Sequence, residues 1–228
     1  MSDARYFFTG LLGIFAVSLS ISVLTPAGQL GSLGPVFKEE AGLVSDVYPN
    51  PPLGLAAVGK KVYVAEGCQT CHSQLVRGLE AADIERGWGG RRTVARDYVG
   101  EVHPVLGAYR IGPDLANVGS PAWRNEPDGD TSRPRKRDAV WQLVHLYNPT
   151  ALVLESTMPA YRHLFDERKI TGVSSPDALE LPASLQPKAG FEIVPKPAAK
   201  ALVAYLASLD RSHALKEAGK SAPAIVAK

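Results

Sequence analysis

The sequence predicts a mainly α-helical protein in which one N-terminal transmembrane helix precedes a helical domain with long irregular loops. Three observations lead to this prediction. The chain has an uncharged apolar run over residues 6–24, it carries its only two cysteines in the motif Cys68-Gln-Thr-Cys71-His72, and it shows an amphipathic helical pattern over residues 198–209. A length of 228 residues allows one ordinary domain with appendages, or two small ones.

The apolar run is long enough to cross a membrane. Its nearest charged neighbours are Arg5 and Lys38, and as a helix its 19 residues would cover roughly 28 Å of a hydrocarbon layer of about 30 Å. A cleaved secretory signal is the alternative, since Thr25-Pro26-Ala27 ends in a small residue. The run exceeds a usual signal core, however, and no clean A-x-A site follows. We therefore expect a retained anchor over residues 1–33, in contact with membrane lipid, with its N-terminus inside.

The cysteine motif is typical of covalent attachment of a c-type haem. Each thiol can add to one vinyl group, while the imidazole of His72 coordinates the iron. A short disulfide or half of a zinc site would have to use the same pair, Cys68 and Cys71. A disulfide does not explain the adjacent histidine, and the other histidines are scattered singly, at His103, His145, His163 and His213. We expect one covalent haem c, attached on the outer side of the cytoplasmic membrane.

Composition divides the rest of the chain. Residues 34–54 are rich in proline and glycine and predict a stiff linker. A domain is expected over residues 55–212, with loop insertions at about 120–138 and 166–197, followed by a loosely held tail over 213–228. The first insertion carries a basic cluster that could dock an acidic partner or anionic head groups, although such clusters are usually only solvated: Arg133, Arg135, Lys136 and Arg137.

Three helices are expected within the domain. Residues 56–66 suit a helix that ends at Gly67, and Gly59 and Tyr63 would share a face that another helix can approach closely. The pattern at 198–209 is the matching partner. A further helix should start after Asp138 and end before Asn148-Pro149.

Met158 is the candidate for a second axial ligand. It is the only methionine besides the initiator, and Pro159 biases its backbone to an extended form that can lay the thioether across a haem face. Imidazole and thioether ligation raises the reduction potential relative to two imidazoles, which suits an electron carrier. The alternative ligands are His103, His145 and His163.

The order of a helix with Gly59 and Tyr63, the haem motif, and a last helix resembles the class I cytochrome c fold, in which the terminal helices cross over the haem edge. That resemblance gives a role to the segment Arg110-Ile-Gly-Pro-Asp-Leu115. The carbonyl of Pro113 would accept the outer N–H of His72 and so orient the ligand, which needs its second nitrogen satisfied. Read without the resemblance, the segment is an ordinary turn.

The resemblance extends to the membrane-anchored mono-haem subunit of cbb-type haem–copper oxidases. It rests on the haem motif with its continuation to Arg77, on Ile84-Glu-Arg-Gly-Trp88, Val94-Ala-Arg-Asp-Tyr98 and His103-Pro104, and on Arg110-Ile-Gly-Pro-Asp-Leu115 and Met158-Pro-Ala-Tyr161. It implies an electron-transfer subunit, without a catalytic centre of its own, that takes electrons from a donor cytochrome c. It would pass them to the catalytic haem–copper subunit, with further cytochrome c subunits as partners. It also makes Arg77 and Arg110 candidate haem-propionate or interface contacts, the alternative being that both are ordinary surface arginines.

Two other functions share these features. The small cytochrome c subunit of a nitric oxide reductase is similar in anchor, haem and topology, although residues 84–104 favour the oxidase. A free-standing anchored carrier is the second alternative. Nucleic acid is not an expected partner, because 25 basic and 23 acidic residues leave a formal net charge of only +2.

Overall fold

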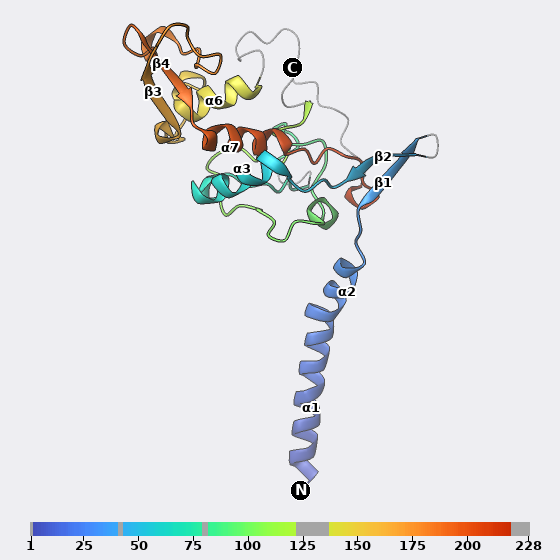
Figure 1. The fold of residues 1–228 in the computed structure, drawn as a ribbon. Coiled ribbons are helices and arrows are strands. Elements are labelled where there is room, and N and C mark those ends of the chain that lie inside the picture. Colours follow the sequence, from blue (N-terminus) through green and yellow to red (C-terminus); the bar gives the residue numbers. More distant parts are fainter. Residues whose placement is uncertain (1, 41–42, 79–81, 122–136, 220–228) are drawn as a thin grey trace. The chain divides into compact units, whose positions relative to one another are not determined.

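The computed structural model describes residues 2–40, 43–78, 82–121 and 137–219, and Figure 1 shows their fold. The chain divides into two compact units. One comprises residues 1–50 with 95–101, and the other comprises residues 51–94 with 102–228. The basic residues Arg133, Arg135 and Lys136 lie outside the described residues.

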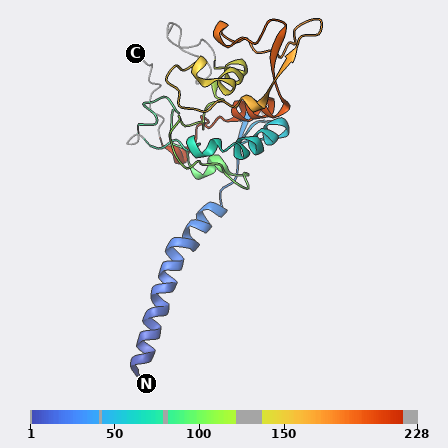
Figure 2. The same ribbon diagram turned by 90° about the vertical axis from the view of Figure 1, so that its left-hand side faces the viewer.

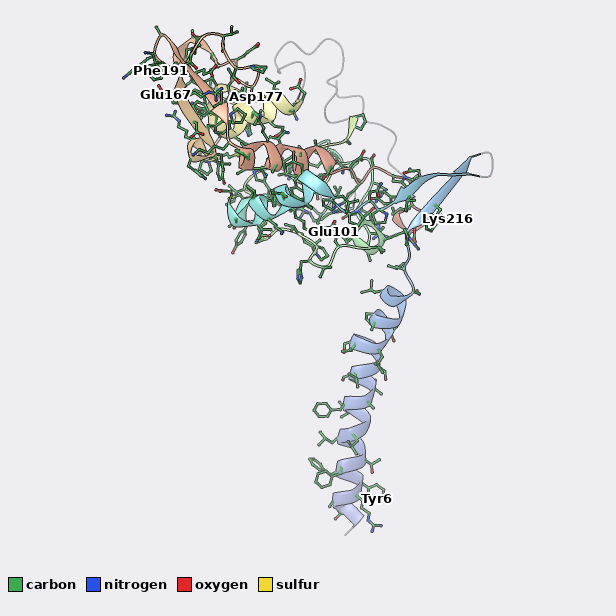
Figure 3. All side chains as sticks on the ribbon, viewed as in Figure 1. Tyr6, Glu101, Glu167, Asp177, Phe191 and Lys216 are labelled. Atoms are coloured by element: carbon green, nitrogen blue, oxygen red, sulfur yellow. The ribbon has the colours of Figure 1, made fainter. Side chains whose placement is uncertain are left out.

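The first unit begins with the predicted membrane helix. Helix α1 (Ser2–Leu19), a π-helical turn η1 (Ser20–Leu24) and helix α2 (Thr25–Gly31) follow one another without a break. Residues Asp3–Gly31 are long and apolar enough to cross a membrane, and their side chains, including the labelled Tyr6, project from the helix (Figure 3). The π-turn ends two residues before Pro26, which has no N–H to donate to the previous turn.

A hairpin follows in the segment predicted to be a linker. Strands β1 (Val36–Glu40) and β2 (Leu43–Tyr48) pair antiparallel, with Val36 opposite Tyr48. The sequence predicted a stiff linker over residues 34–54 and gave no sign that part of it pairs as strands. Valine, phenylalanine and tyrosine favour paired strands, and the prolines that suggested a spacer stand after β2, where they end it.

A second segment of this unit packs on the hairpin. The 3₁₀ turn η3 (Ala95–Tyr98) buries Asp97, whose Oδ1 accepts a hydrogen bond from the Tyr48 hydroxyl at 2.5 Å. Arg96 donates to the carbonyl of Gly34, just after α2. The chain therefore returns to the end of its anchor some sixty residues later in sequence.

The second unit is built around two crossing helices, α3 (Gly54–Ala65) and α7 (Pro197–Ser208), which lie side by side in both ribbon views (Figures 1 and 2). A Cβ on Gly59 would lie 2.8 Å from the Cβ of Tyr205 and closer still to the carbonyl of Ala201. The rings of Tyr63 and Tyr205 meet edge to face at 5.3 Å. The predicted close approach at Gly59 is confirmed, and only glycine permits it.

Helix α6 (Ala139–Tyr147) packs against α7 and starts as predicted. Asp138 caps it by accepting the backbone N–H of Trp141 at 3.0 Å. Asn148 ends it, and the 3₁₀ turns η4 (Pro149–Ala151) and η5 (Arg162–Leu164) follow. The core of this unit gathers buried side chains from α3, α6 and α7, among them Tyr63, Val144, Leu146, Leu202, Tyr205 and Leu206.

The excursion predicted at 166–197 is partly regular. Strands β3 (Phe165–Lys169) and β4 (Phe191–Pro195) pair antiparallel, with a 3₁₀ turn η6 (Ala183–Leu185) between them. Glu167 and Phe191, labelled in Figure 3, belong to these two strands. Glu192 is buried and accepts hydrogen bonds from Arg168 Nε at 2.8 Å and from the Ser175 N–H at 2.7 Å. These bonds hold the connecting loop onto β4.

The predicted tail does not begin at residue 213. Arg91 Nε donates to the His213 carbonyl at 2.7 Å, and Arg92 donates to the Glu217 carbonyl at 3.0 Å. Leu215 is buried just before the 3₁₀ turn η7 (Lys216–Ala218). The chain is thus held in place at least to this turn.

Candidate functional site

One cavity of about 370 Å³ lies within the second unit. Its walls are mainly apolar and come from α3, the haem-motif turn, α6, α7 and two loops. The lining includes Tyr63, Cys68, Cys71, His72, Gly112, Pro113, Trp141, His145, Met158, Tyr161, Leu202 and Leu206. Sites for small molecules and cofactors are commonly cavities of about 300–1,000 Å³ with few polar groups.

Cys68, Cys71 and His72 all line the cavity. Cys68 to Cys71 make a single helical turn, α4 (Cys68–Cys71), which follows α3 after Gly67. Both cysteines are free thiols, Cys68 buried and Cys71 half-buried. Among the described residues no group of three or more His, Cys, Asp or Glu side chains could hold a metal ion. The two cysteines are thus not joined in a disulfide in this structure.

His72 faces Pro113, the neighbour that the resemblance to cytochromes c implies for it. Its Nδ1 lies 2.8 Å from the carbonyl oxygen of Pro113, which leaves Nε2 as the nitrogen for a metal. Burial lowers the pKa of His72 below its ordinary 6.5, and the hydrogen bond to Pro113 only partly offsets this. The neutral imidazole, which is the form that binds metals, is therefore favoured.

Met158 lines the same cavity and packs against the hydrophobic core. Tyr161 N–H donates to the Leu146 carbonyl at 2.8 Å and ties the end of this loop to α6, and Met158 N–H donates to Ser156 Oγ at 3.3 Å within the loop. The cavity therefore contains both an imidazole and a thioether. These are the two donors of a haem iron with mixed ligation.

Of the three alternative ligands, only one reaches the cavity. His103 is exposed, and His163 is exposed and paired with Glu66 at 2.8 Å. His145 lines the cavity but stacks on Trp141, with ring centroids 4.6 Å apart and planes 12° apart. Burial lowers the pKa of His145 to about 4, so this ring is neutral and packed near pH 7.

Arg110 does not reach the cavity. Its guanidinium pairs with Asp83 at 2.7 Å and also donates to Ser73 Oγ and to the carbonyl of Leu75. Arg77 binds the same carboxylate at 2.9 Å. Burial opposes the ionisation of Asp83, but the hydrogen bonds from the two arginines outweigh it and hold the pKa of Asp83 below its usual range. The structure thus separates Arg110 from the other five predicted site residues, which all line one cavity.

Among the cavity residues that were not predicted as site residues are the aromatic residues Tyr161 and Trp141. Burial raises the pKa of Tyr161 to about 12 and that of Cys68 to about 11, and both residues line the cavity. Trp141 joins the cavity wall through its stack on His145. A sequence signal existed for the latter pair, since aromatic rings four apart on a helix share a face.

Gly112 gives a direct test of how tightly the imidazole is held. A Cβ at this position would lie 2.8 Å from Nδ1 and 2.9 Å from Nε2 of His72, and closer still to Cε1. Gly112→Ala is therefore expected to displace the ring, to lower the haem content and to destabilise the holoprotein by about 1–3 kcal/mol. Haem content per chain and thermal unfolding of the purified protein measure both effects.

Gly90→Ala is the matched control, because a Cβ there meets nothing within 4 Å. It should leave haem content and unfolding unchanged. If Gly112→Ala behaves like Gly90→Ala, the ring does not pack as described.

The residues present fit a haem. The cavity has a suitable size and an apolar wall, it offers two thiols in one turn, and it places one imidazole and one thioether in the same lining. The imidazole that would bind iron already has its outer nitrogen satisfied.

Comparison with known proteins agrees with this geometry. The chain matches the model of a protein family described as "Cytochrome C oxidase, mono-heme subunit/FixO" over residues 13–178. This range includes most of the anchor and every predicted site residue from Cys68 to Met158. No curated protein matches the chain.

Proposed function

The chain belongs to the family of mono-haem subunits of cytochrome c oxidases, the subunit carried by cbb-type enzymes, and on this premise we propose that it is the electron-transfer subunit of a respiratory oxidase. It would receive electrons from a donor cytochrome c and pass them through one covalent haem c to the catalytic haem–copper subunit. The observation that carries the proposal is the shared cavity of Cys68, Cys71, His72 and Met158.

The attachment chemistry belongs to the two thiols. Each S–H would add across one vinyl group, forming a thioether to Cys68 and another to Cys71, with no other oxidant or reductant required. The one-electron chemistry is supplied by the iron. The residues of the chain orient His72 through Pro113 and close the cavity with α6 and the Met158 loop.

With His72 and Met158 as axial ligands, the iron would have no open position for oxygen. The chain is therefore proposed to carry electrons and to leave oxygen reduction to the catalytic subunit. Imidazole and thioether ligation gives a higher potential than two imidazoles, which suits a carrier near the oxidising end of a respiratory chain.

The location follows from the anchor and the attachment chemistry. We propose a single-pass protein of the bacterial cytoplasmic membrane, with residues 3–31 in the lipid, the N-terminus inside, and the haem domain on the periplasmic or outer face. Its partners would be the catalytic subunit, further cytochrome c subunits and the donor. The family match favours the oxidase over a nitric oxide reductase subunit or a free-standing carrier.

The proposal is tested by purifying the protein from its native membranes through an affinity tag on this chain. A many-helix subunit that contains haem and copper should copurify in equal amount, and this chain should carry one haem that survives a denaturing gel. Metal analysis and mass spectrometry of the complex provide the measurement, with untagged membranes as the control.

The alternatives give different results in the same experiment. A chain that emerges alone would be a free-standing carrier, and a partner whose active site lacks copper would indicate the reductase. Either outcome would overturn the proposed role in an oxidase.

A further inference from the structure

Two segments meet at the His72–Pro113 hydrogen bond, and each continues into a polar residue. Ser73 directly follows His72, and Asp114 directly follows Pro113. The Ser73 hydroxyl donates to Asp114 Oδ2 at 2.6 Å, in a position where both side chains are buried. The His72–Pro113 hydrogen bond orients the imidazole. One residue later in each segment, the Ser73–Asp114 hydrogen bond joins the same two segments again.

Asp114 holds more than the serine. Its Oδ2 also accepts the backbone N–H of Leu75 at 2.7 Å, and its Oδ1 accepts the N–H of Ala116 at 2.9 Å. The side chain has 1% of its surface exposed, so these bonds are shielded from water. The carboxylate of Asp114 therefore holds the segment that follows His72 against the segment that follows Pro113.

Arg110 extends this arrangement to a second buried acid. Its Nε donates to Ser73 Oγ at 2.8 Å, and its Nη1 binds Asp83 Oδ2 at 2.7 Å. The serine hydroxyl accepts from Arg110 and donates to Asp114, so its rotation is fixed from both sides. Arg110, Ser73 and Asp114 form a continuous hydrogen-bonded group beside the haem motif, and none of the three lines the cavity.

We propose that Asp114, acting through Ser73 and supported by Arg110, is a positioning residue of the haem site. It would hold the Pro113 carbonyl against His72 Nδ1 and so set the orientation and basicity of the proximal imidazole. Groups that orient a ligating histidine tune the metal although they do not touch it. The proposal rests on the proposed haem ligation by His72 and gives Arg110 a role different from contact with a propionate.

The test compares three variants of the full chain as ferrous holoprotein in detergent micelles. Asp114→Asn keeps the size and shape of the side chain but replaces one carboxylate oxygen with an NH₂ group, which cannot accept the hydrogen bonds that this oxygen accepts. Ser73→Ala removes the hydroxyl that links Arg110 to Asp114. Asp97→Asn is the matched control, because Asp97 is a fully buried acid in the other unit. The measured quantities are the exchange rate of the His72 Nδ1 proton by NMR and the reduction potential.

Asp114→Asn is expected to accelerate exchange of the His72 Nδ1 proton at least tenfold and to shift the potential. Ser73→Ala should act in the same direction by a smaller factor, and Asp97→Asn should change neither quantity. The backbone N–H of Tyr205, in the core of α7, serves as an internal reference. Its exchange should remain unchanged in all three variants, which separates a local effect on His72 from general destabilisation.

The proposal would be overturned if Asp114→Asn had the wild-type exchange rate of the His72 Nδ1 proton and the wild-type reduction potential. It would also be overturned if proton exchange accelerated equally at His72 Nδ1 and at the Tyr205 N–H. Should Asp114→Asn yield no holoprotein, Ser73→Ala decides: wild-type behaviour in that variant also overturns it. None of these results bears on which subunits copurify, so failure of the positioning role is distinguishable from failure of the proposed function.

Discussion

Replacing both Cys68 and Cys71 with serine is expected to abolish covalent haem on this chain. Each hydroxyl is a far weaker nucleophile than a thiol and forms no thioether with a vinyl group. The apoprotein would also lose the group that fills a cavity of about 370 Å³ between α3, α6, α7 and the Met158 loop. Haem staining after denaturing electrophoresis and the intact mass of the chain should both show no haem, and oxidase activity of the complex should fall to background.

Single variants separate the two sulfur atoms. Cys68→Ser and Cys71→Ser should each permit at most one thioether and should give low yields of holoprotein. Gln69→Ala and Thr70→Ala are the matched controls, because they alter the same turn without removing sulfur, and they should retain haem. Haem that stays bound to the double variant on a denaturing gel, or that acidified organic solvent extracts from the wild type, would falsify covalent attachment at this motif.

The parts of the fold that could be predicted depend on contacts between near neighbours in sequence. The anchor follows from an uncharged run, α6 from a capping aspartate and a terminating Asn-Pro, and the haem motif from five consecutive residues. The close helix approach at Gly59 could be predicted as well, because a glycine on an apolar helix face lets another helix come near. The crossing with α7 confirms it.

The hairpin over residues 36–48 shows where such reasoning fails. Its strands are short, and glycines and prolines on both sides dominate the composition of the segment. What stabilises the hairpin is a long-range contact, the hydrogen bond from Tyr48 to the buried Asp97, and no local pattern reveals a partner 49 residues away. Strand pairing outweighed local composition here.

Arg110 illustrates the same limit within the site. The family resemblance suggested that Arg110 contacts a haem propionate or an interface, yet Asp83 binds the guanidinium at 2.7 Å. A buried carboxylate attracts the nearest arginine because leaving it unpaired is costly. The identity of that acid depends on a fold that brings Asp83 to both Arg77 and Arg110, and no local pattern in the sequence encodes that fold. The place of Met158 in the cavity lining could be expected, by contrast, because the chain has no other internal thioether.

Met158→His is expected to keep the haem attached and to lower its reduction potential by an amount on the order of 0.1–0.3 V, a fraction of the roughly 0.8 V that axial ligands span. Cys68, Cys71 and His72 are untouched, so attachment should proceed. An imidazole donates more strongly to ferric iron than a soft thioether does, and it therefore stabilises the oxidised form. Potentiometry of the purified complex and its ferric spectrum provide the measurement, and the charge-transfer band of sulfur ligation should disappear.

The same variant should slow oxygen consumption although the catalytic subunit is unchanged, because a haem of lower potential accepts electrons less readily from the donor. His163→Gln and His103→Gln are the matched controls. Both side chains are exposed, neither lines the cavity, and both variants should retain the wild-type potential and spectrum. A Met158→His protein that keeps its band and its potential would show that another residue binds the iron. His145 would then be the next residue to replace, since it is the one alternative histidine in the lining of the cavity.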